Sequence, residues 1–258
     1  MAVTPITNTQ DIWRAQLPRP AIDGHKYHRG FAAVIGAPEL TGATRLAATA
    51  CSRIGCGLVS VVAEQRGDIY RMTLPPDIMV QADLPEKANV LLGGSGGIPT
   101  EQSTAMLTAS GLDARVFDAG ALPTYKERGQ LDSTCILTPH TGEFERAFGP
   151  ITRPDHAAAQ QLAQASGATV VLKSAQTVIA SADGRVAINT HTSPYLAKAG
   201  TGDVLAGLIA GLAAQGMPHF EACCAAVWIH GEAGKRIGPG LVAGDISERL
   251  PDILKDLL

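Results

Sequence analysis

Short apolar runs alternate with helical patterns along most of the chain. The apolar runs are near-continuous, which is typical of strands buried on both faces rather than on one. The strand candidates are Phe31–Gly36, Leu58–Ala63, Val90–Leu92, Arg115–Asp118, Cys135–Thr138 and Thr169–Lys173. Strands of this kind separated by helices predict an α/β fold with a mostly parallel central sheet and helices on both faces.

The helix candidates place apolar residues at three- and four-residue spacing, often with a glycine or proline just beyond the end. They are Thr41–Ile54, Gln102–Ala109, Gly142–Phe148, His156–Ser166, 203–215, 219–237 and a short terminal helix over Ile253–Leu257. Asp245 follows a glycine-rich turn and is expected to be an N-cap.

Two further segments complete the expected architecture. Thr177–Ser181 and Arg185–Asn189, joined by Ala182-Asp-Gly184, predict an antiparallel hairpin at one edge of the sheet. Residues 1–24 contain three prolines and are expected to form an irregular lead-in, too short for a further domain in front. Residues 25–258 are then expected to form one domain, an ordinary length for a single α/β core.

Composition excludes several classes of protein. A formal charge of −3 argues against non-specific nucleic-acid binding, which needs a basic face. The apolar runs are shorter than the roughly 20 residues that span a bilayer, and the first residues lack a secretory signal. The five cysteines form no Cys-x-x-Cys pair and have apolar neighbours, which predicts reduced thiols in a cytoplasmic protein.

The most informative stretch is Tyr195-Leu-Ala-Lys-Ala-Gly-Thr-Gly-Asp-Val-Leu-Ala-Gly207. Gly200, Thr201 and Gly202 form a loop with little side-chain bulk that leads into an apolar helix. The N–H groups and the positive dipole end of such a helix suit a phosphate. Asp203 is then either a carboxylate stabilised by the helix dipole or a base that accepts a proton from a substrate hydroxyl.

Other unusual residues follow the ends of predicted strands, where open parallel sheets bind their ligands. His140 and Glu143 follow one strand; they either cap the next helix or contact a polar ligand, with Glu143 orienting water, a metal or phosphate. Gly93–Gly97 is either a tight turn or a nest of amides for a pyrophosphate. Lys173 ends a buried strand, where a nucleotide phosphate would be its partner if it is not merely a surface lysine. Ala43, next to Gly42 at a helix start, allows close contact with a flat ligand.

Taken together, these motifs resemble the ADP/ATP-dependent NAD(P)H-hydrate dehydratase family of the ribokinase-like superfamily. The resemblance extends from about Lys26 to Leu250, and its most specific elements are Leu137-Thr-Pro-His-Thr-Gly-Glu-Phe144 and Ala199-Gly-Thr-Gly-Asp-Val-Leu-Ala-Gly207. Shorter matches are Gly42-Ala43, Val116–Ala119, Val171–Lys173, Ala214–Gly216 and Gly240–Asp245.

The resemblance implies a repair reaction on hydrated NADH or NADPH. A nucleotide phosphorylates the hydroxyl on the hydrated ring, and phosphate then leaves to restore the double bond. The implied nucleotide is ADP or ATP, with ADP favoured, and Mg²⁺ is expected on its phosphates. A homo-oligomer, often a tetramer, is the implied assembly, with neither a nucleic-acid nor a membrane partner.

The resemblance also implies a role for each candidate residue. The phosphoryl transfer step is expected to use Asp203 with Gly200, Thr201 and Gly202. The hydrated dinucleotide is expected to contact Ala43, Gly94, Gly96, His140 and Asp203. The nucleotide is expected to contact Lys173, Ser174, Ala175, Gln176, Thr177 and Gly202. Glu143 is the candidate metal contact.

Three departures from the family pattern bear on nucleotide choice and substrate fit. Gly93-Gly-Ser-Gly-Gly97 stands where the family usually has Gly-Pro-Gly-Leu-Gly, which puts Ser95 at the proline when the flanking glycines are aligned. Ser174 replaces a glycine, and Thr190-His-Thr-Ser-Pro194 replaces a Gly-Asn-Pro-like turn. Two other hypotheses therefore stay open: a small-molecule kinase that releases its phosphorylated product, and a non-catalytic nucleotide-binding protein.

Overall fold

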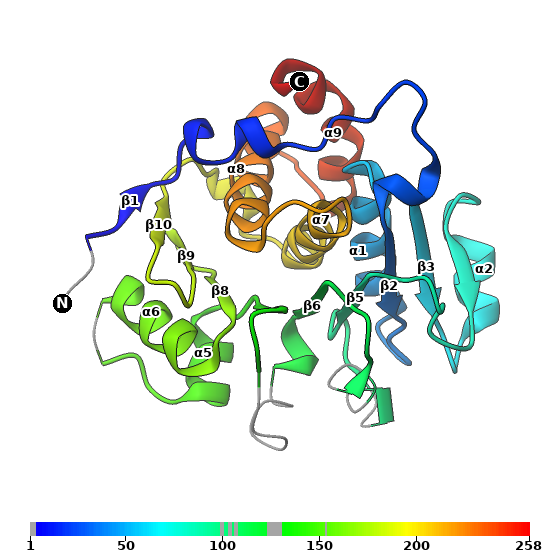
Figure 1. The fold of residues 1–258 in the computed structure, drawn as a ribbon, viewed down its shortest axis with the longest axis horizontal. Helices are drawn as coiled ribbons and strands as arrows, with labels where there is room; N and C mark the ends of the chain where they lie inside the picture. The colour runs from blue at the N-terminus through cyan, green and yellow to red at the C-terminus, as the bar shows by residue number, and fades with distance from the viewer. Residues whose placement is uncertain (1–3, 99–100, 103–104, 106–107, 123–130, 153) are drawn as a thin grey trace.

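The computed structural model describes residues 4–98, 101–102, 105, 108–122, 131–152 and 154–258. Its centre is a ten-stranded sheet with strand order β1-β10-β9-β8-β7-β6-β5-β2-β3-β4 (Figure 1). The strands are β1 Ile6–Thr7, β2 Phe31–Ile35, β3 Leu58–Val62, β4 Met79–Gln81, β5 Val90–Gly93, β6 Ala114–Phe117, β7 Cys135–Leu137, β8 Thr169–Leu172, β9 Thr177–Ala180 and β10 Val186–Asn189.

The sheet is parallel across β4, β3, β2, β5, β6, β7 and β8, and antiparallel across β8, β9 and β10. The predicted parallel sheet and the late hairpin are therefore confirmed. The hairpin is not the edge of the sheet, however, because β1 pairs in parallel with β10 and lies outside it. The lead-in that was expected to be irregular thus supplies the edge strand, and its Trp13 is fully buried.

Helices cover both faces of the sheet. Their bounds are α1 Thr41–Arg53, α2 Gly67–Thr73, α5 Thr141–Phe148, α6 Asp155–Ser166, α7 Thr201–Ala214, α8 His219–Ile237 and α9 Ala243–Leu257. The predicted helices over 41–54, 142–148, 156–166, 203–215 and 219–237 are confirmed, with ends shifted by two residues or fewer. The predicted helix over 102–109 falls largely outside the described residues. Within the described part of the chain, no helix is long and apolar enough to cross a membrane.

The sheet separates two apolar cores. On one face Val34, Val61 and Val116 pack with apolar residues of α1, α7, α8 and α9. On the other face Leu91 and Phe117 pack with apolar residues of α5 and α6. Because neighbouring residues of a strand point to opposite faces, strands between two cores need apolar residues at nearly every position. This explains the near-continuous apolar runs in the sequence.

The C-terminal helix differs from its prediction. α9 begins at Ala243 rather than near Ile253, and it continues through Pro251. Asp245 lies inside the first turn of α9 and not at the N-cap. From there its Oδ2 accepts a hydrogen bond from the N–H of Val242 at 2.8 Å. The prediction that Asp245 is the N-cap is therefore wrong: Val242 is the N-cap, and Asp245 is the third residue of the helix. The strand β4 and the helix α2 had no predicted counterpart.

The helices α1 and α7 lie in unusually close contact. A methyl group added at Gly207 would lie 2.1 Å from the carbonyl oxygen of Ala47, and one at Gly211 would lie 2.3 Å from Ile54 Cγ2. Gly207 and Gly211 are therefore required by close packing within the chain. This contact fixes α7, and with it the Gly200–Gly202 loop, against the helix that follows β2.

We expect Gly207→Ala to destabilise the fold by about 2 kcal/mol or more, because the added methyl overlaps the α1 backbone and a helix must move. Chemical denaturation followed by circular dichroism would measure the loss. Gly244→Ala in α9 is the matched control, because a methyl there meets nothing within 4 Å. Equal stability of the Gly207 variant and the wild type would contradict the packing argument.

Candidate active site

The glycine-rich loop before α7 is held by its own backbone and by one hydroxyl. Gly200 is the N-cap and has a φ of 90°, in the left-handed region that favours glycine. Thr201 Oγ1 donates to the carbonyl oxygens of Leu196 at 2.8 Å and Lys198 at 2.9 Å. The hydroxyl of Thr201 therefore fixes the loop, and any contact to a phosphate falls to the N–H groups of the first helical turn, which have no intrahelical acceptor.

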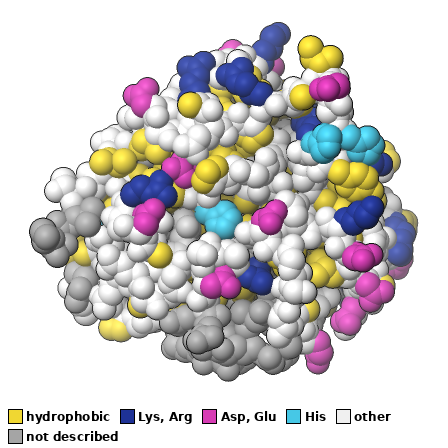
Figure 2. Space-filling view, viewed as in Figure 1, with side chains coloured by type: hydrophobic (Ala, Val, Ile, Leu, Met, Phe, Trp, Pro, Cys, Tyr) yellow, Lys and Arg dark blue, Asp and Glu magenta, His cyan; other side chains and the backbone are white. Residues whose placement is uncertain are grey.

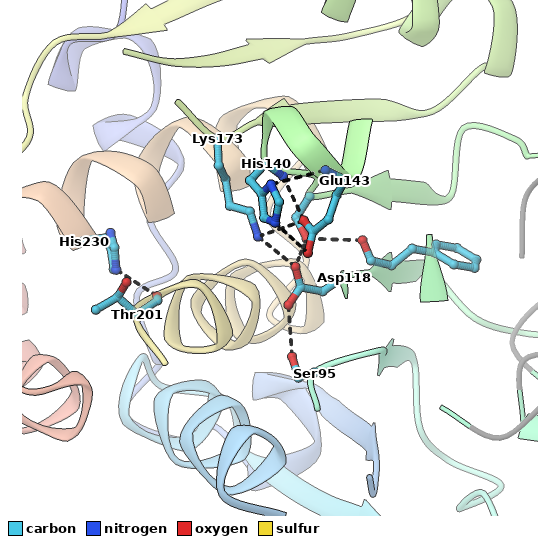
Figure 3. Close-up of polar contacts among 9 residues, drawn as sticks. Ser95, Asp118, His140, Glu143, Lys173, Thr201 and His230 are labelled. Atoms are coloured by element: carbon cyan, nitrogen blue, oxygen red, sulfur yellow. Dashed lines mark hydrogen bonds and ion pairs between the residues drawn. The ribbon is translucent and has the colours of Figure 1, made fainter. Parts of the chain in front are cut away.

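A buried ion pair lies at the carboxyl ends of β6 and β8. Lys173 Nζ lies 2.9 Å from Asp118 Oδ1, and their side chains are 18% and 3% exposed. The same oxygen accepts a hydrogen bond from Thr138 Oγ1 at 2.8 Å, and Asp118 Oδ2 accepts one from Ser95 Oγ at 3.2 Å. Asp118 is thus the centre of the polar cluster drawn in Figure 3. Each of the two carboxylate oxygens of Asp118 thus accepts at least one hydrogen bond, as a buried polar group requires.

Asp203 faces this cluster from the first turn of α7. Burial raises the pKa of its carboxyl to about 6, and the negative charge of Asp118 adds to the effect. A hydrogen bond with Ser95 and the ammonium of Lys173 act in the opposite direction, while Glu143 raises the pKa further. A carboxyl with a pKa near 6 is ionised at neutral pH and accepts a proton readily, which is what a general base requires.

His140 and Glu143 cap α5 reciprocally. The His140 N–H donates to Glu143 Oε2 at 2.9 Å, and the Glu143 N–H donates to His140 Nδ1 at 3.2 Å. His140 Nε2 lies 3.3 Å from Glu143 Oε1, and Lys173 Nζ lies 3.9 Å from Glu143 Oε2. The capping alternative therefore describes the geometry that is present. The imidazole of His140 is nevertheless half exposed, so it remains available to a ligand.

The structure gives Glu143 no metal-site geometry. Among the described residues, no group of three or more His, Cys, Asp or Glu side chains is arranged to hold a metal ion. Both carboxylate oxygens of Glu143 already face donors from His140 and Lys173. The metal contact of Glu143 therefore stays a prediction.

A cavity of about 590 Å³ opens beside Lys173, which forms part of its wall. Five of the residues expected to contact the nucleotide line it: Lys173, Ser174, Ala175, Thr177 and Gly202. Its remaining walls are Asn189, Thr192, Ser193, Pro194, Leu196, Ala197, Thr201, Leu205, Val227, His230 and Gly231. Gln176 is not among the lining residues; its carbonyl oxygen accepts a hydrogen bond from Ser174 Oγ at 2.9 Å.

His230 of α8 belongs to this cavity and was not anticipated from the sequence. It is buried, and burial lowers the pKa of its imidazole to about 4, so the ring is neutral at pH 7. Its Nε2 lies 3.0 Å from the carbonyl oxygen of Thr201 (Figure 3). A neutral ring donates its N–H to that carbonyl and so supports the loop from behind. A lone histidine in an alanine-rich helix gives no signal of this contact.

The second glycine-rich loop lies at the opposite side of Asp118. A methyl at Gly94 would lie 1.7 Å from the carbonyl oxygen of Asp118, and one at Gly96 would lie 3.1 Å from Ala43 Cβ. Both glycines have positive φ values, 107° and 85°. Close backbone approach thus accounts for these glycines, and it brings the expected substrate contacts Ala43, Gly94 and Gly96 together.

The sequence-predicted residues therefore gather along one rim of the sheet. The Gly94–Gly96 loop and Ala43 lie on one side, the nucleotide-side cavity lies on the other, and Asp118, Lys173 and Asp203 lie between them. Figure 2 shows an exposed histidine near the middle of this face, with acidic and basic side chains around it. A second cavity of about 440 Å³, beside Phe144 and Leu162, contains none of the predicted residues.

Comparison with known proteins agrees with this geometry. A family model described as NAD(P)H-hydrate dehydratase matches residues 32–255. The chain belongs to the NAD(P)H-hydrate dehydratase family. Members of this family that resemble the chain include an ADP-dependent (S)-NAD(P)H-hydrate dehydratase from Neisseria meningitidis, 36% identical over 88% of this chain and 86% of that protein.

Other relatives are longer than this chain. A bifunctional NAD(P)H-hydrate repair enzyme from Moorella thermoacetica is 35% identical over 95% of this chain but only 53% of its own length. The chain spans about half the length of such bifunctional relatives.

Solved structures show the same fold. The ADP/ATP-dependent NAD(P)H-hydrate dehydratase of Bacillus subtilis, co-crystallised with ATP and Mg²⁺, superposes with a TM-score of 0.87, 29% identity and full coverage of both chains. A hydroxyethylthiazole kinase from Pyrococcus horikoshii, at 16% identity, a TM-score of 0.61 and coverage of 90% of this chain and 91% of that chain, shares the fold alone. The predicted ribokinase-like fold is thereby confirmed.

We expect Asp203→Asn to raise the melting temperature at about pH 8, because burial disfavours the charged carboxyl. The unfolded carboxyl titrates near 3.8 and the folded one near 6, so the folded state binds more protons between these values. Wild-type stability should therefore fall as the pH rises through that window, and the advantage of the variant should shrink toward pH 4. Thermal melts at several pH values would measure it; an advantage independent of pH would contradict the raised pKa.

Proposed function

We propose that this chain dehydrates hydrated NADH or NADPH in a nucleotide-dependent reaction that restores the reduced dinucleotide. The observation that carries the proposal is the place of Asp203. It lies at the start of a glycine-capped helix, beside a buried ion pair, and burial raises the pKa of its carboxyl to about 6. Membership of the NAD(P)H-hydrate dehydratase family supports the choice of substrate.

The proposed chemistry has two stages. Asp203 accepts the proton of the ring hydroxyl. The hydroxyl oxygen forms a bond to the terminal phosphorus of the nucleotide, and the bond between that phosphorus and the nucleotide's bridging oxygen breaks. The N–H groups of the Gly200–Gly202 loop stabilise the charge on the moving phosphoryl group. The C–O bond between the ring and the phosphate then breaks. Phosphate leaves with the electron pair of that bond while the ring nitrogen donates electrons to the ring carbon. Loss of a proton from the neighbouring ring carbon restores the double bond.

The nucleotide is proposed to bind in the 590 Å³ cavity, with ADP favoured over ATP. Lys173 contributes an ammonium, and Gly202 lets this ammonium approach the helix start, since a methyl there would lie 3.4 Å from Lys173 Nζ. Ser174, Ala175 and Thr177 form the adjoining wall, while the proposed role of Gln176 is limited to its backbone. The Neisseria meningitidis relative is named as ADP-dependent, which supports this preference.

Mg²⁺ is proposed to bind mainly through the nucleotide phosphates. The donor set fits that arrangement, because the described carboxylates do not form a metal cage and Mg²⁺ commonly keeps several waters and phosphate oxygens as ligands. Glu143 is the nearest candidate for a protein contact. The ion would supply charge neutralisation at the phosphates, while proton removal stays with Asp203.

The hydrated dinucleotide is proposed to lie across the opposite side of the rim. Ala43, Gly94 and Gly96 offer a surface with little side-chain bulk, against which a flat ring system can pack. The exposed imidazole of His140 is placed to donate or accept a hydrogen bond from the same direction. Asp203 then lies between the ring hydroxyl and the nucleotide.

We also propose a cytoplasmic homo-oligomer, with a tetramer as the state to test by light scattering. The five cysteines are all free and buried, which suits a reducing compartment. Leu40, Tyr195 and Val242 are exposed apolar side chains that an interface between copies would cover. On the face seen in Figure 2, described basic and acidic side chains are interspersed, which supports the absence of a nucleic-acid partner.

The decisive experiment mixes the purified protein with hydrated NADH, Mg²⁺ and either ADP or ATP. We expect absorbance of the reduced nicotinamide to return with one nucleotide and not without it. Nucleotide consumption with other alcohols, without recovery of absorbance, would favour a small-molecule kinase. Nucleotide binding without any turnover would favour a non-catalytic protein.

We expect Asp203→Asn to keep nucleotide binding but to lose turnover by about 100-fold or more, because the loop remains and the proton acceptor is gone. Isothermal titration and the absorbance assay would measure the two effects separately. Asp245→Asn is the matched control. Asp245 has the same position in α9 that Asp203 has in α7, and its carboxylate caps the helix. Wild-type turnover in the Asp203 variant would overturn the proposed base.

A further inference from the structure

The segment 190–197 forms one wall of the cavity proposed for the nucleotide. It follows β10 and begins with Thr190-His-Thr-Ser-Pro194, one of the three departures from the family pattern. Five of its residues line the cavity: Thr192, Ser193, Pro194, Leu196 and Ala197. His191 is not among the lining residues, and its side chain is bound to α8 instead.

The imidazole of His191 makes three contacts with α8. Its ring stacks on Trp228, with the ring centroids 4.3 Å apart and an angle of 4° between the planes. Its Nε2 lies 2.8 Å from Glu232 Oε2, and its Nδ1 lies 2.9 Å from Lys235 Nζ. Because these partners are spaced by four and three residues, they lie on one face of the helix, over about two turns. One side chain thus attaches the segment to α8.

The two polar contacts fix the form of the His191 ring. An ammonium only donates and an ionised carboxylate only accepts, so Nδ1 accepts from Lys235 and Nε2 donates to Glu232. Burial disfavours the charge of Glu232, but hydrogen bonds from Arg236 and His191 outweigh it and lower the pKa of the Glu232 carboxyl. The neutral imidazole with its proton on Nε2 is the form that satisfies both partners.

The backbone of the segment also lies directly on α8. A methyl at Gly231 would lie 1.8 Å from the carbonyl oxygen of His191, and one at Gly234 would lie 2.6 Å from Leu196 Cγ. The same carbonyl oxygen of His191 accepts a hydrogen bond from Asn189 Nδ2 at 2.9 Å. The two glycines permit the close approach but have no side chain that could hold the segment. The side chain of His191 adds that attachment, through one stacked ring and two polar contacts.

We propose that His191 is a positioning residue for the nucleotide, whose contacts with α8 hold the segment 190–197 in the place where it forms the cavity wall. The inference rests on the proposed function for the identity of the ligand, and it goes beyond that function by giving a role to a residue outside the cavity. A wall that is fixed before binding costs less to order when the ligand arrives, so binding is tighter. The surface proposed for the dinucleotide is formed by α1 and by the loop after β5, so it should not depend on His191.

Isothermal titration of the purified protein with ADP and with ATP is the test. We expect His191→Ala to raise the Kd for the bound nucleotide by about tenfold, because the wall must then be ordered on binding. In the absorbance assay, KM for the nucleotide should rise by a similar factor, while KM for hydrated NADH should change by less than about twofold. A loss of folded protein would instead lower the number of binding sites and kcat, so this split identifies positioning.

Two further variants test the contacts themselves. Glu232→Ala should raise the Kd as well, and the double variant should bind no more weakly than His191→Ala, because one contact cannot be lost twice. His191→Phe keeps the stacking on Trp228 and loses both polar contacts, so its Kd should lie between those of the wild type and His191→Ala. If His191→Ala does not fold, His191→Phe supplies the comparison with the wild type.

His219→Ala is the matched control. His219 lies in the first turn of the same helix and contacts the carbonyl oxygen of Ser133 at 3.0 Å, and it is not among the residues that line the cavity. An unchanged Kd in His191→Ala would overturn the inference, as would an equal rise in His219→Ala or additive losses in the double variant.

Nucleotide binding needs no turnover, so the titration separates this inference from the proposed function. Weaker binding in His191→Ala, without recovery of reduced nicotinamide by the wild type, would keep the positioning role and reject the dehydratase reaction. Absence of binding of both ADP and ATP to the wild type would overturn both proposals.

Discussion

The ion pair between Lys173 and Asp118 is the constraint on which the site depends. It joins the ends of two strands that are separated by β7, at 2.9 Å and with little solvent access. A buried charge without a partner is costly, and removing Lys173 would leave Asp118 without its cationic partner, whereas removing Asp118 would leave Lys173 with Glu143 Oε2 at 3.9 Å. The pair also sets the chemistry on both sides. Asp118 presents negative charge to Asp203 and helps to raise its pKa, while the ammonium of Lys173 faces the cavity proposed for the nucleotide.

Helix packing keeps the second half of the site in register with this pair. The glycines of α7 allow its backbone to lie directly on α1, with Gly207 against Ala47 and Gly211 against Ile54. Since α1 follows β2 and its first turn carries Ala43, the same contact positions Asp203 relative to the proposed substrate surface. The fold thus uses a tightly packed helix pair to hold a carboxylate in surroundings that disfavour its charge. Such a carboxylate lowers the stability of the folded state but accepts a proton more readily, which is a trade-off between stability and activity.

Much of this architecture could be predicted because its causes are local in sequence. Near-continuous apolar runs identify strands buried on both faces, and parallel strands then bring Asp118, His140 and Lys173 to one rim without any knowledge of contacts. What could not be predicted depends on distant partners. β1 is two residues long, too short to show a strand pattern in the sequence, and it is a strand because it pairs with the outer edge of β10. The contact of His230 with the Thr201 carbonyl and that of Ser95 with Asp118 join residues 29 and 23 positions apart.

Four described carboxylates are the third residue of their helices, and their differences separate the capping carboxylates from the proposed base; they are Glu143, Asp203, Glu221 and Asp245. Glu143 accepts a hydrogen bond from the His140 N–H at 2.9 Å, and Asp245 accepts one from the Val242 N–H at 2.8 Å. Asp203 and Glu221 make no such bond. α7 has a left-handed glycine at its N-cap, while the N-cap of α8 is Pro218, which has no N–H, and Glu221 pairs with Arg185 instead. In a carboxylate that caps its helix, one oxygen already accepts a hydrogen bond from the backbone. Asp203 does not cap α7, and Ser95, Asp118 and Lys173 act on its carboxyl instead, in keeping with its proposed role as a base.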